Sequence, residues 1–146
     1  MRRILVVAHK TLGGEHLREE VQRRLAEGDC TFHLLVPERH PNDHAWTDGQ
    51  VRRDAEAVLE EGLASFRALD PTGSTSFTGE VGDVNPVHAV HQLLIRGEQF
   101  DEIILSTLPP GPSRWLKQDV PHKMAREVTI PVRHVVAERV RTLHAP

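Results

Sequence analysis

The sequence predicts a three-layer α/β fold, in which helices cover both faces of a five-stranded parallel sheet with the strand order 3-2-1-4-5. Short apolar runs rich in β-branched residues alternate with longer segments of helical period along the chain. The first run, residues 3–8, is almost continuously apolar, which is typical of a strand buried on both faces of a parallel sheet. The 146 residues suffice for one domain, residues 1–146, with a core of its own.

The first half of the chain is expected to hold three strands and two helices. In order, they are a strand at 3–8, an amphipathic helix between 14 and 28, a strand at 31–36, a long helix at 51–69 and a strand at 74–81. Residues 37–49 have no period and contain two prolines, so they predict a loop. It is longer than the roughly 2–6 residues usual between a strand and a helix, which suggests that it covers a site.

The second half of the chain is expected to continue the alternation of strands and helices. Asn85 followed by Pro86 predicts a helix start, and residues 101–106 and 130–137 predict the last two strands. Between these strands, Ser113 is expected to cap a short helical turn, and Asp119 a second helix through its side chain. The charged tail, residues 138–146, is expected to fray.

Composition excludes several classes of protein. The net charge of −3, with 18 basic and 21 acidic residues and no long basic run, argues against a nucleic-acid partner. The longest clean apolar stretch, residues 4–8, is far shorter than the ~20 residues of a membrane span, so no membrane partner is expected. Cys30 is the single cysteine, so no disulfide can form within the chain and a cytoplasmic location is expected.

The predicted strand order also places a candidate site. The winding of the sheet reverses between strands 1 and 4, so the crevice at their carboxyl ends brings residues 9–14 opposite residues 106–114. Hydroxyls at Thr107 and Ser113 and cations at Arg114 and Lys117 could hold a phosphate or carboxylate there. Three prolines between 109 and 112 remove backbone donors, so a rigid turn without a ligand is the alternative.

Known catalytic patterns do not fit this corner. A pyrophosphatase-type loop, Ser-Gly-Gly-x-Asp-Ser, differs from Thr-Leu-Gly-Gly-Glu-His at residues 11–16, and the His-x-Gly-His of nucleotidyl transferases is not matched at 9–12. A structural zinc site usually needs more thiolates than Cys30 supplies. We therefore expect no catalytic residue and no metal, and slow nucleotide hydrolysis is disfavoured because no base or nucleophile is identifiable.

Four stretches make the chain resemble the universal stress protein family over nearly its full length. They are the opening strand at 4–8, the strand at 32–36 with its long loop and helix, Gly-Glu-Val-Gly-Asp at 79–83 followed by Pro86, and Ile-Pro-Val at 130–132. The resemblance implies the Rossmann-like, adenine nucleotide alpha hydrolase-like fold derived above. It also implies a homodimer formed through the last strand, where Val132, Val135 and Val136 would otherwise leave an apolar edge exposed.

The resemblance fails at the loop with which some members bind ATP. Those members carry an acidic residue at the end of the first strand, where this chain has His9, and a Gly-x2-Gly-x9-Gly-Ser/Thr loop after the fourth strand. Gly111 is the only glycine after Gly97, so no alignment supplies the three glycines. An Asp119 carboxylate at the following helix start would satisfy its N–H donors and repel phosphate. ATP is therefore expected not to bind in the family's usual way, and no cofactor is expected.

Two functions remain open from the sequence. The leading expectation is a regulatory or interaction protein without catalytic activity; the alternative is a module that binds an adenine nucleotide or another small anion in the crevice between strands 1 and 4. The resemblance places part of an adenine pocket at the end of the second strand, residues 35–36. The candidate ligand-binding residues are His9, Thr11, Gly13, Leu35, Val36, Ser106, Thr107, Gly111, Ser113, Arg114 and Lys117.

Overall fold

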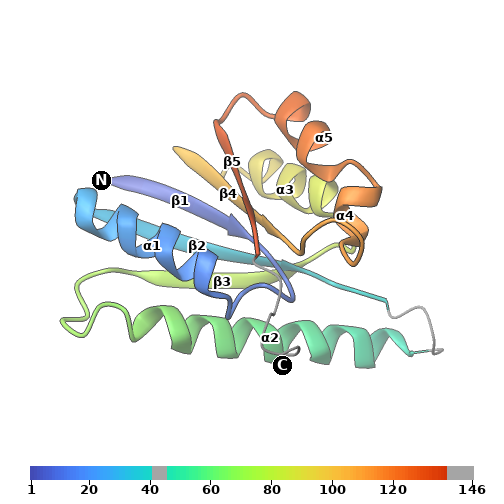
Figure 1. Ribbon diagram of the computed structural model, residues 1–146, viewed down its shortest axis with the longest axis horizontal. Helices are drawn as coiled ribbons and strands as arrows, with labels where there is room; N and C mark the ends of the chain where they lie inside the picture. The colour runs from blue at the N-terminus through green and yellow to red at the C-terminus, as the bar shows by residue number, and fades with distance from the viewer. Residues whose placement is uncertain (41–45, 138–146) are drawn as a thin grey trace.

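The computed structural model describes residues 1–40 and 46–137 and contains a parallel sheet in the order β3-β2-β1-β4-β5 (Figure 1). The predicted fold class and strand order are confirmed. The strands are β1 (Arg2–Val7), β2 (Cys30–Pro37), β3 (Phe77–Gly82), β4 (Glu102–Thr107) and β5 (Val132–Val136). The helices are α1 (Glu15–Glu27), α2 (Asp48–Arg67), α3 (Pro86–Ile95), α4 (Arg114–Lys117) and α5 (Val120–Glu127).

Two apolar clusters lie on opposite faces of the sheet, because successive side chains of a strand point to opposite sides. Ile4 and Val6 of β1 belong to the cluster covered by α1 and α2. Leu5 and Val7 belong to the cluster covered by α3 and α5, and none of the four is accessible to solvent. The central strand is thus buried on both faces, as its apolar run predicted.

The predicted start of the third strand at residue 74 is wrong, since β3 begins at Phe77. The Asp70 carboxylate accepts hydrogen bonds from the Thr72 hydroxyl, from the Thr75 N–H at 2.7 Å and from the Ser74 hydroxyl at 3.2 Å. These bonds hold the pKa of Asp70 well below its usual range. The side chains and backbone of 72–75 are therefore tied to Asp70 rather than to the ladder of the sheet.

Helix α2 begins three residues before the predicted Val51. Thr47 and Gln50 form a capping box, in which the Thr47 hydroxyl accepts from the Gln50 N–H and the Gln50 side chain accepts from the Thr47 N–H. The predicted loop at 37–49 is correspondingly shorter, and its residues 41–45 lie outside the described part of the chain. The last strand is also shorter than expected, and the predicted fraying of 138–146 falls on residues that the structure does not describe.

The caps predicted at Asn85 and Ser113 are confirmed. Asn85 Oδ1 accepts hydrogen bonds from the N–H groups of Val87 and His88, and Ser113 Oγ accepts from the N–H of Leu116. Both caps lie at the carboxyl edge of the sheet, and they fix how α3 and α4 leave it. Over the described residues, no helix is both long and apolar enough to cross a membrane.

Candidate functional site

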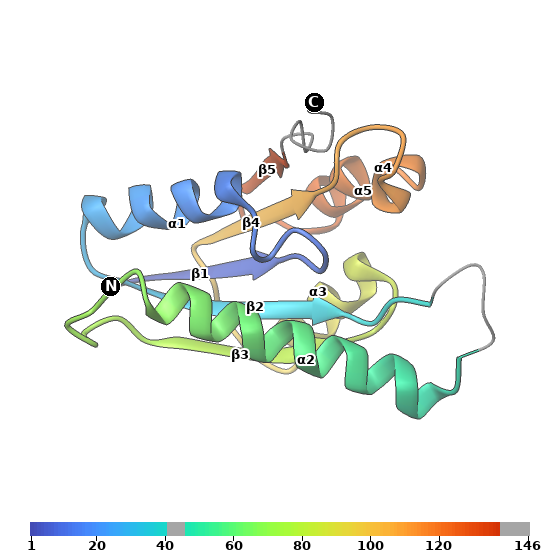
Figure 2. The same cartoon turned by 60° about the horizontal axis from the view of Figure 1, so that its bottom comes forward.

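A cavity of about 670 Å³ opens at the carboxyl edge of the sheet, between β1 and β4. The arrowheads of β1, β2 and β4 point to this edge, where α4 and α5 also lie (Figure 2). Its walls come from residues 9–11 after β1, 38–39 after β2, 84, 85 and 87 around the start of α3, 106–108 at the end of β4, 112–115 in the following loop and α4, and one side of α5. Small-ligand sites have volumes of roughly 300–1,000 Å³, so the cavity has the size of one.

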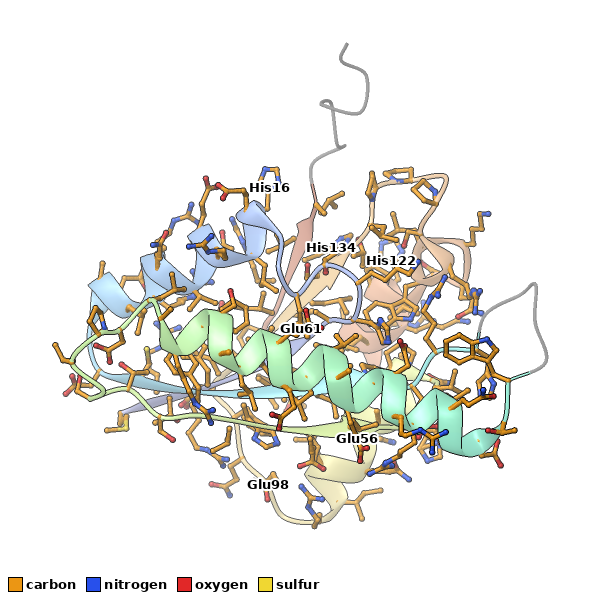
Figure 3. All side chains as sticks on the ribbon, turned by 90° about the horizontal axis from the view of Figure 1, so that it is seen from below. His16, Glu56, Glu61, Glu98, His122 and His134 are labelled. Atoms are coloured by element: carbon orange, nitrogen blue, oxygen red, sulfur yellow. The ribbon has the colours of Figure 1, made fainter. Side chains whose placement is uncertain are left out.

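The cavity floor consists of hydroxyl groups that are bonded to other side chains. The Thr11 and Ser106 hydroxyls lie 2.6 Å apart and both residues are buried. The Thr107 hydroxyl lies 2.9 Å from Nε2 of His134, which Figure 3 shows on β5. The floor is therefore polar and fixed in position, and it joins β1, β4 and β5.

His9 stands between β1 and the cavity and is buried, with 7% of its surface exposed. Among the described residues neither ring nitrogen has a hydrogen-bond partner, although Asp54 Oδ2 lies 3.4 Å from Nε2. Burial lowers the pKa of His9, the Asp54 carboxylate opposes this shift, and the Arg39 and Lys10 cations add to it. Burial thus favours the neutral imidazole, whose two ring nitrogens are themselves enclosed by the protein.

Basic side chains dominate the charged part of the cavity wall. The cations are Lys10, Arg39, Arg114, Lys123 and Arg126, against the two carboxylates Glu38 and Glu127. The whole chain, in contrast, has a net charge of −3. Arg114 Nη1 also donates a 2.7 Å hydrogen bond to the carbonyl oxygen of His40, which joins α4 to the segment after β2. Such a concentration of cations favours an anionic ligand.

The structure brings together six of the eleven predicted site residues. His9, Thr11, Ser106, Thr107, Ser113 and Arg114 line the cavity. The other five do not line it. Leu35 and Val36 are buried in the two apolar clusters, and Lys117 is exposed. Gly111 occupies a turn with a φ of 101°, and Gly13 lines a neighbouring cavity.

Sequence reasoning missed Lys10, Arg39, Lys123 and Arg126. Lys10 follows His9 directly, so it could have been found from the predicted end of the first strand. Lys123 and Arg126 are three residues apart on α5 and therefore share a face of the helix, a signal that was available in the sequence. Arg39 lies in the loop that was expected to cover a site, but nothing in the sequence distinguishes its side chain from the other polar residues of that loop.

The prediction that the Asp119 carboxylate caps the following helix is wrong. Asp119 precedes α5 in the left-handed region, with φ 58° and ψ 38°, and its side chain bonds to no N–H of the helix. An N-capping side chain needs the extended backbone, which Asp119 does not have. Its Oδ1 instead accepts a 2.9 Å hydrogen bond from Nδ1 of His122, an exposed side chain of α5 labelled in Figure 3.

A second cavity, of about 680 Å³, lies on the α2 side of the loop after β1. His9, Lys10 and Arg39 line it as well as the first cavity, so these three residues stand between the two. Its far wall belongs to α2 and includes Asp54 and Glu61, the latter labelled in Figure 3. Positive and negative groups occur in it in equal number, so its walls show no preference for an anion.

Neither metal nor thiol chemistry has a site in the described ranges 1–40 and 46–137. No group of three or more His, Cys, Asp or Glu side chains is placed there to hold a metal ion. Cys30 is buried at the start of β2, and burial raises the pKa of its thiol. A buried thiol with a raised pKa is a poor nucleophile, so Cys30 serves the core.

No family model matches the sequence, and no curated protein matches it either. Solved structures do match the fold. A hypothetical protein, PH0823, has a TM-score of 0.62 at 12% identity, covering 95% of this chain and 99% of that one. A universal stress protein family protein from Arabidopsis thaliana with AMP bound has a TM-score of 0.60 at 11% identity, covering 94% and 93%. This chain has the universal stress protein fold.

A further universal stress protein, in complex with cAMP, has a TM-score of 0.53 at 16% identity and covers 94% of this chain and 98% of that one. The similarity therefore extends over nearly the whole chain in each pair. At these identities it establishes the universal stress protein fold, which the resemblance in the sequence implied. Two of the three proteins hold an adenine nucleotide with one phosphate group.

Proposed function

We propose that the chain is a regulatory domain of the universal stress type that binds an adenine mononucleotide in the crevice between β1 and β4 and catalyses no reaction. The observation that carries the proposal is the cavity of about 670 Å³, whose wall holds five cations in a chain of net charge −3. Two proteins with the same fold hold AMP and cAMP. The proposal places the chain in the cytoplasm, in keeping with its single unpaired cysteine.

A single phosphate suits this crevice better than a triphosphate. The loop after β4 contains Pro109, Pro110 and Pro112, none of which has an N–H group to offer to a polyphosphate chain. Cationic side chains of the wall supply the positive charge instead.

The absence of catalysis is proposed from the arrangement of the polar groups. An activated hydroxyl nucleophile needs a base within hydrogen-bond distance. In the described part of the chain, neither nitrogen of His9 bonds to a hydroxyl, and the Thr11 and Ser106 hydroxyls bond to each other. The Thr107 hydroxyl does lie 2.9 Å from Nε2 of His134, but among the described residues no third group bonds to that imidazole to orient it as a base. These groups can orient a ligand by hydrogen bonds but are not set up to attack it.

Isothermal titration calorimetry with AMP tests the proposal. AMP should bind and adenosine, which lacks the phosphate, should bind at least about tenfold more weakly. Arg114→Gln should weaken AMP binding, whereas Lys117→Gln, which removes an exposed cation of the same helix outside the cavity, should not. Failure of folded protein to bind millimolar AMP at low salt would refute the proposal.

The proposed assembly is a homodimer paired through β5. This strand lies at the edge of the sheet, and Val136 is 38% exposed there. Pairing of two such edges would cover Val136 and the unpaired backbone groups, whereas Val135, which the sequence placed on the exposed edge, is already buried within the single chain. Light scattering at micromolar concentration should give twice 16.4 kDa, and Val136→Lys should shift the mass towards one chain. A single-chain mass for the unaltered protein would contradict the dimer.

A further inference from the structure

The cationic side chains of the cavity come from opposite faces of the sheet. Lys10 and Arg39 form one group, and both also line the second cavity, against α2. His9 lines the same two cavities as these cations. This end of the cavity, defined by Lys10 and Arg39, is the α2 end.

The other group lies on a helix that covers the opposite face. Lys123 and Arg126 belong to α5, whose Val120 and Met124 are buried in the apolar cluster beneath α3. Neither of these two cations lines the second cavity. Arg114 of α4 belongs to neither group, because its Nη1 donates to the carbonyl oxygen of His40, the residue after Arg39. The end defined by Lys123 and Arg126 is the α5 end.

Apolar side chains also line the cavity. Val84 and Val87 at the start of α3, Leu108 after β4 and Trp115 of α4 are among the cavity residues. Each end also holds one carboxylate, Glu38 and Glu127, but each keeps an excess of positive charge. Glu38 is further offset by Arg52 of α2, at 3.5 Å.

From this arrangement we infer that the ligand of the crevice carries two separated anionic groups, one for each end, on a ring system that lies against the apolar wall. A nucleotide with phosphate groups on both sides of its ribose has this form. The inference rests on the proposed function and specifies its ligand. A diphosphate chain has the same total charge, but it would gather that charge at one end and leave the cations of the other end without a partner.

The test compares three adenine nucleotides by calorimetry at one salt concentration. AMP carries one phosphate, ADP carries two adjacent phosphates, and adenosine 3′,5′-bisphosphate carries two separated ones. We expect the bisphosphate to bind about tenfold more tightly than AMP or ADP, since each further charge-assisted contact is worth about that factor. ADP is the control for charge alone.

Variants at each end of the cavity test which cations bind each of the two phosphate groups. Arg39→Gln at the α2 end and Arg126→Gln at the α5 end should each remove the advantage of the bisphosphate over AMP. Lys117→Gln, outside the cavity, should preserve it. Circular dichroism melting of every variant verifies that the loss does not come from unfolding.

The outcomes separate this inference from the proposed function. If ADP binds as tightly as the bisphosphate or more tightly, and AMP still binds, the inference of two separated anionic groups is wrong. The proposed binding of an adenine mononucleotide is not affected by that result. An advantage of the bisphosphate that survives both Arg39→Gln and Arg126→Gln would overturn it as well. If none of the three nucleotides binds to folded protein, the proposed function itself fails.

Discussion

The hydroxyl of Thr11 lies 2.6 Å from the hydroxyl of Ser106, and this contact joins the loop after β1 to the end of β4. Both residues are buried, with 5% and 2% of their surface exposed. The bond therefore crosses the line at which the winding of the sheet reverses, directly beneath the crevice. It gives the site a floor that is fixed before any ligand arrives.

Replacing either partner of this bond should destabilise the fold measurably. Thr11→Val or Ser106→Ala leaves one buried hydroxyl without its partner, which costs about 1–3 kcal/mol of the free energy of unfolding. The double variant removes both hydroxyls, so it should lose clearly less than the sum of the single losses. Urea denaturation of the four proteins measures this, and strictly additive losses would mean that the hydroxyls do not interact.

Local signals in the sequence predicted most of the fold. The apolar run of β1 and the Asn85-Pro86 helix start each depend on neighbours within one element, so both could be recognised without the structure. The start of β3 could not, because the Asp70 side chain binds residues that have strand-like composition. Composition carries no sign of such a side-chain network.

The candidate site was predictable in position but not in chemistry. Strand order alone placed His9 opposite Arg114 at the crevice, since it follows from topology. The five cations of the wall come from four separate segments of the chain, and their convergence is a property of the tertiary structure. The same holds for Asp119, whose left-handed backbone turns away the side chain that composition assigns to a cap.

Arg24 should be a sensitive position on the α1 face of the sheet. Its guanidinium donates to both oxygens of Glu102, at 2.9 and 2.7 Å, and to Glu20 at 3.0 Å, and the same bonds to Glu102 hold the pKa of that carboxyl below its usual value. Arg24→Met leaves two largely buried carboxylates short of a partner and should cost about 3–5 kcal/mol.

Arg23→Met is the matched control for Arg24→Met. Arg23 also pairs with Glu20, but its side chain is 53% exposed, so its loss should cost less than about 1 kcal/mol. Urea denaturation at neutral pH and constant ionic strength gives both values. Equal losses for the two variants would show that burial of the Arg24 network contributes nothing.

His9 should make the stability of the fold depend on pH. Burial lowers the pKa of His9 in the folded state below the ~6.5 of the unfolded chain, so protons bind the unfolded state more readily. The free energy of unfolding should therefore be highest above about pH 6.5 and fall as the pH drops below it, by at most ~1.4 kcal/mol per pH unit for this group. His134, whose pKa burial also lowers, acts with the same sign.

The variant His9→Gln isolates the contribution of His9 from that of His134 and the carboxylates. Urea denaturation of both proteins between pH 5 and pH 8 gives the difference in stability, wild type minus variant. This difference should shrink as the pH falls through the window, because only the wild type takes up the additional proton on unfolding. A difference that stays constant, or grows towards acid, would be incompatible with a buried neutral His9.

Gly79 should tolerate no side chain, in contrast to Gly13. A Cβ at Gly79 would lie 2.5 Å from Cδ1 of Leu59 on α2 and 2.9 Å from the backbone oxygen of Leu34, so Gly79→Ala requires the Leu59 side chain to move and the backbones of β2 and β3 to shift apart. Overpacking of this kind costs about 1–3 kcal/mol. A Cβ at Gly13 meets nothing within 4 Å, so Gly13→Ala should change stability by less than about 0.5 kcal/mol.

Thermal and urea denaturation of both alanine variants measure this contrast, and calorimetry with AMP adds a second readout. Gly13 lies outside the cavity between β1 and β4, so Gly13→Ala should leave the affinity for AMP unchanged. If Gly79→Ala is as stable as the wild type, the close contacts with Leu59 and with the backbone of Leu34 do not require a glycine there. The glycine of the Gly-Glu-Val-Gly stretch would then need an explanation other than packing.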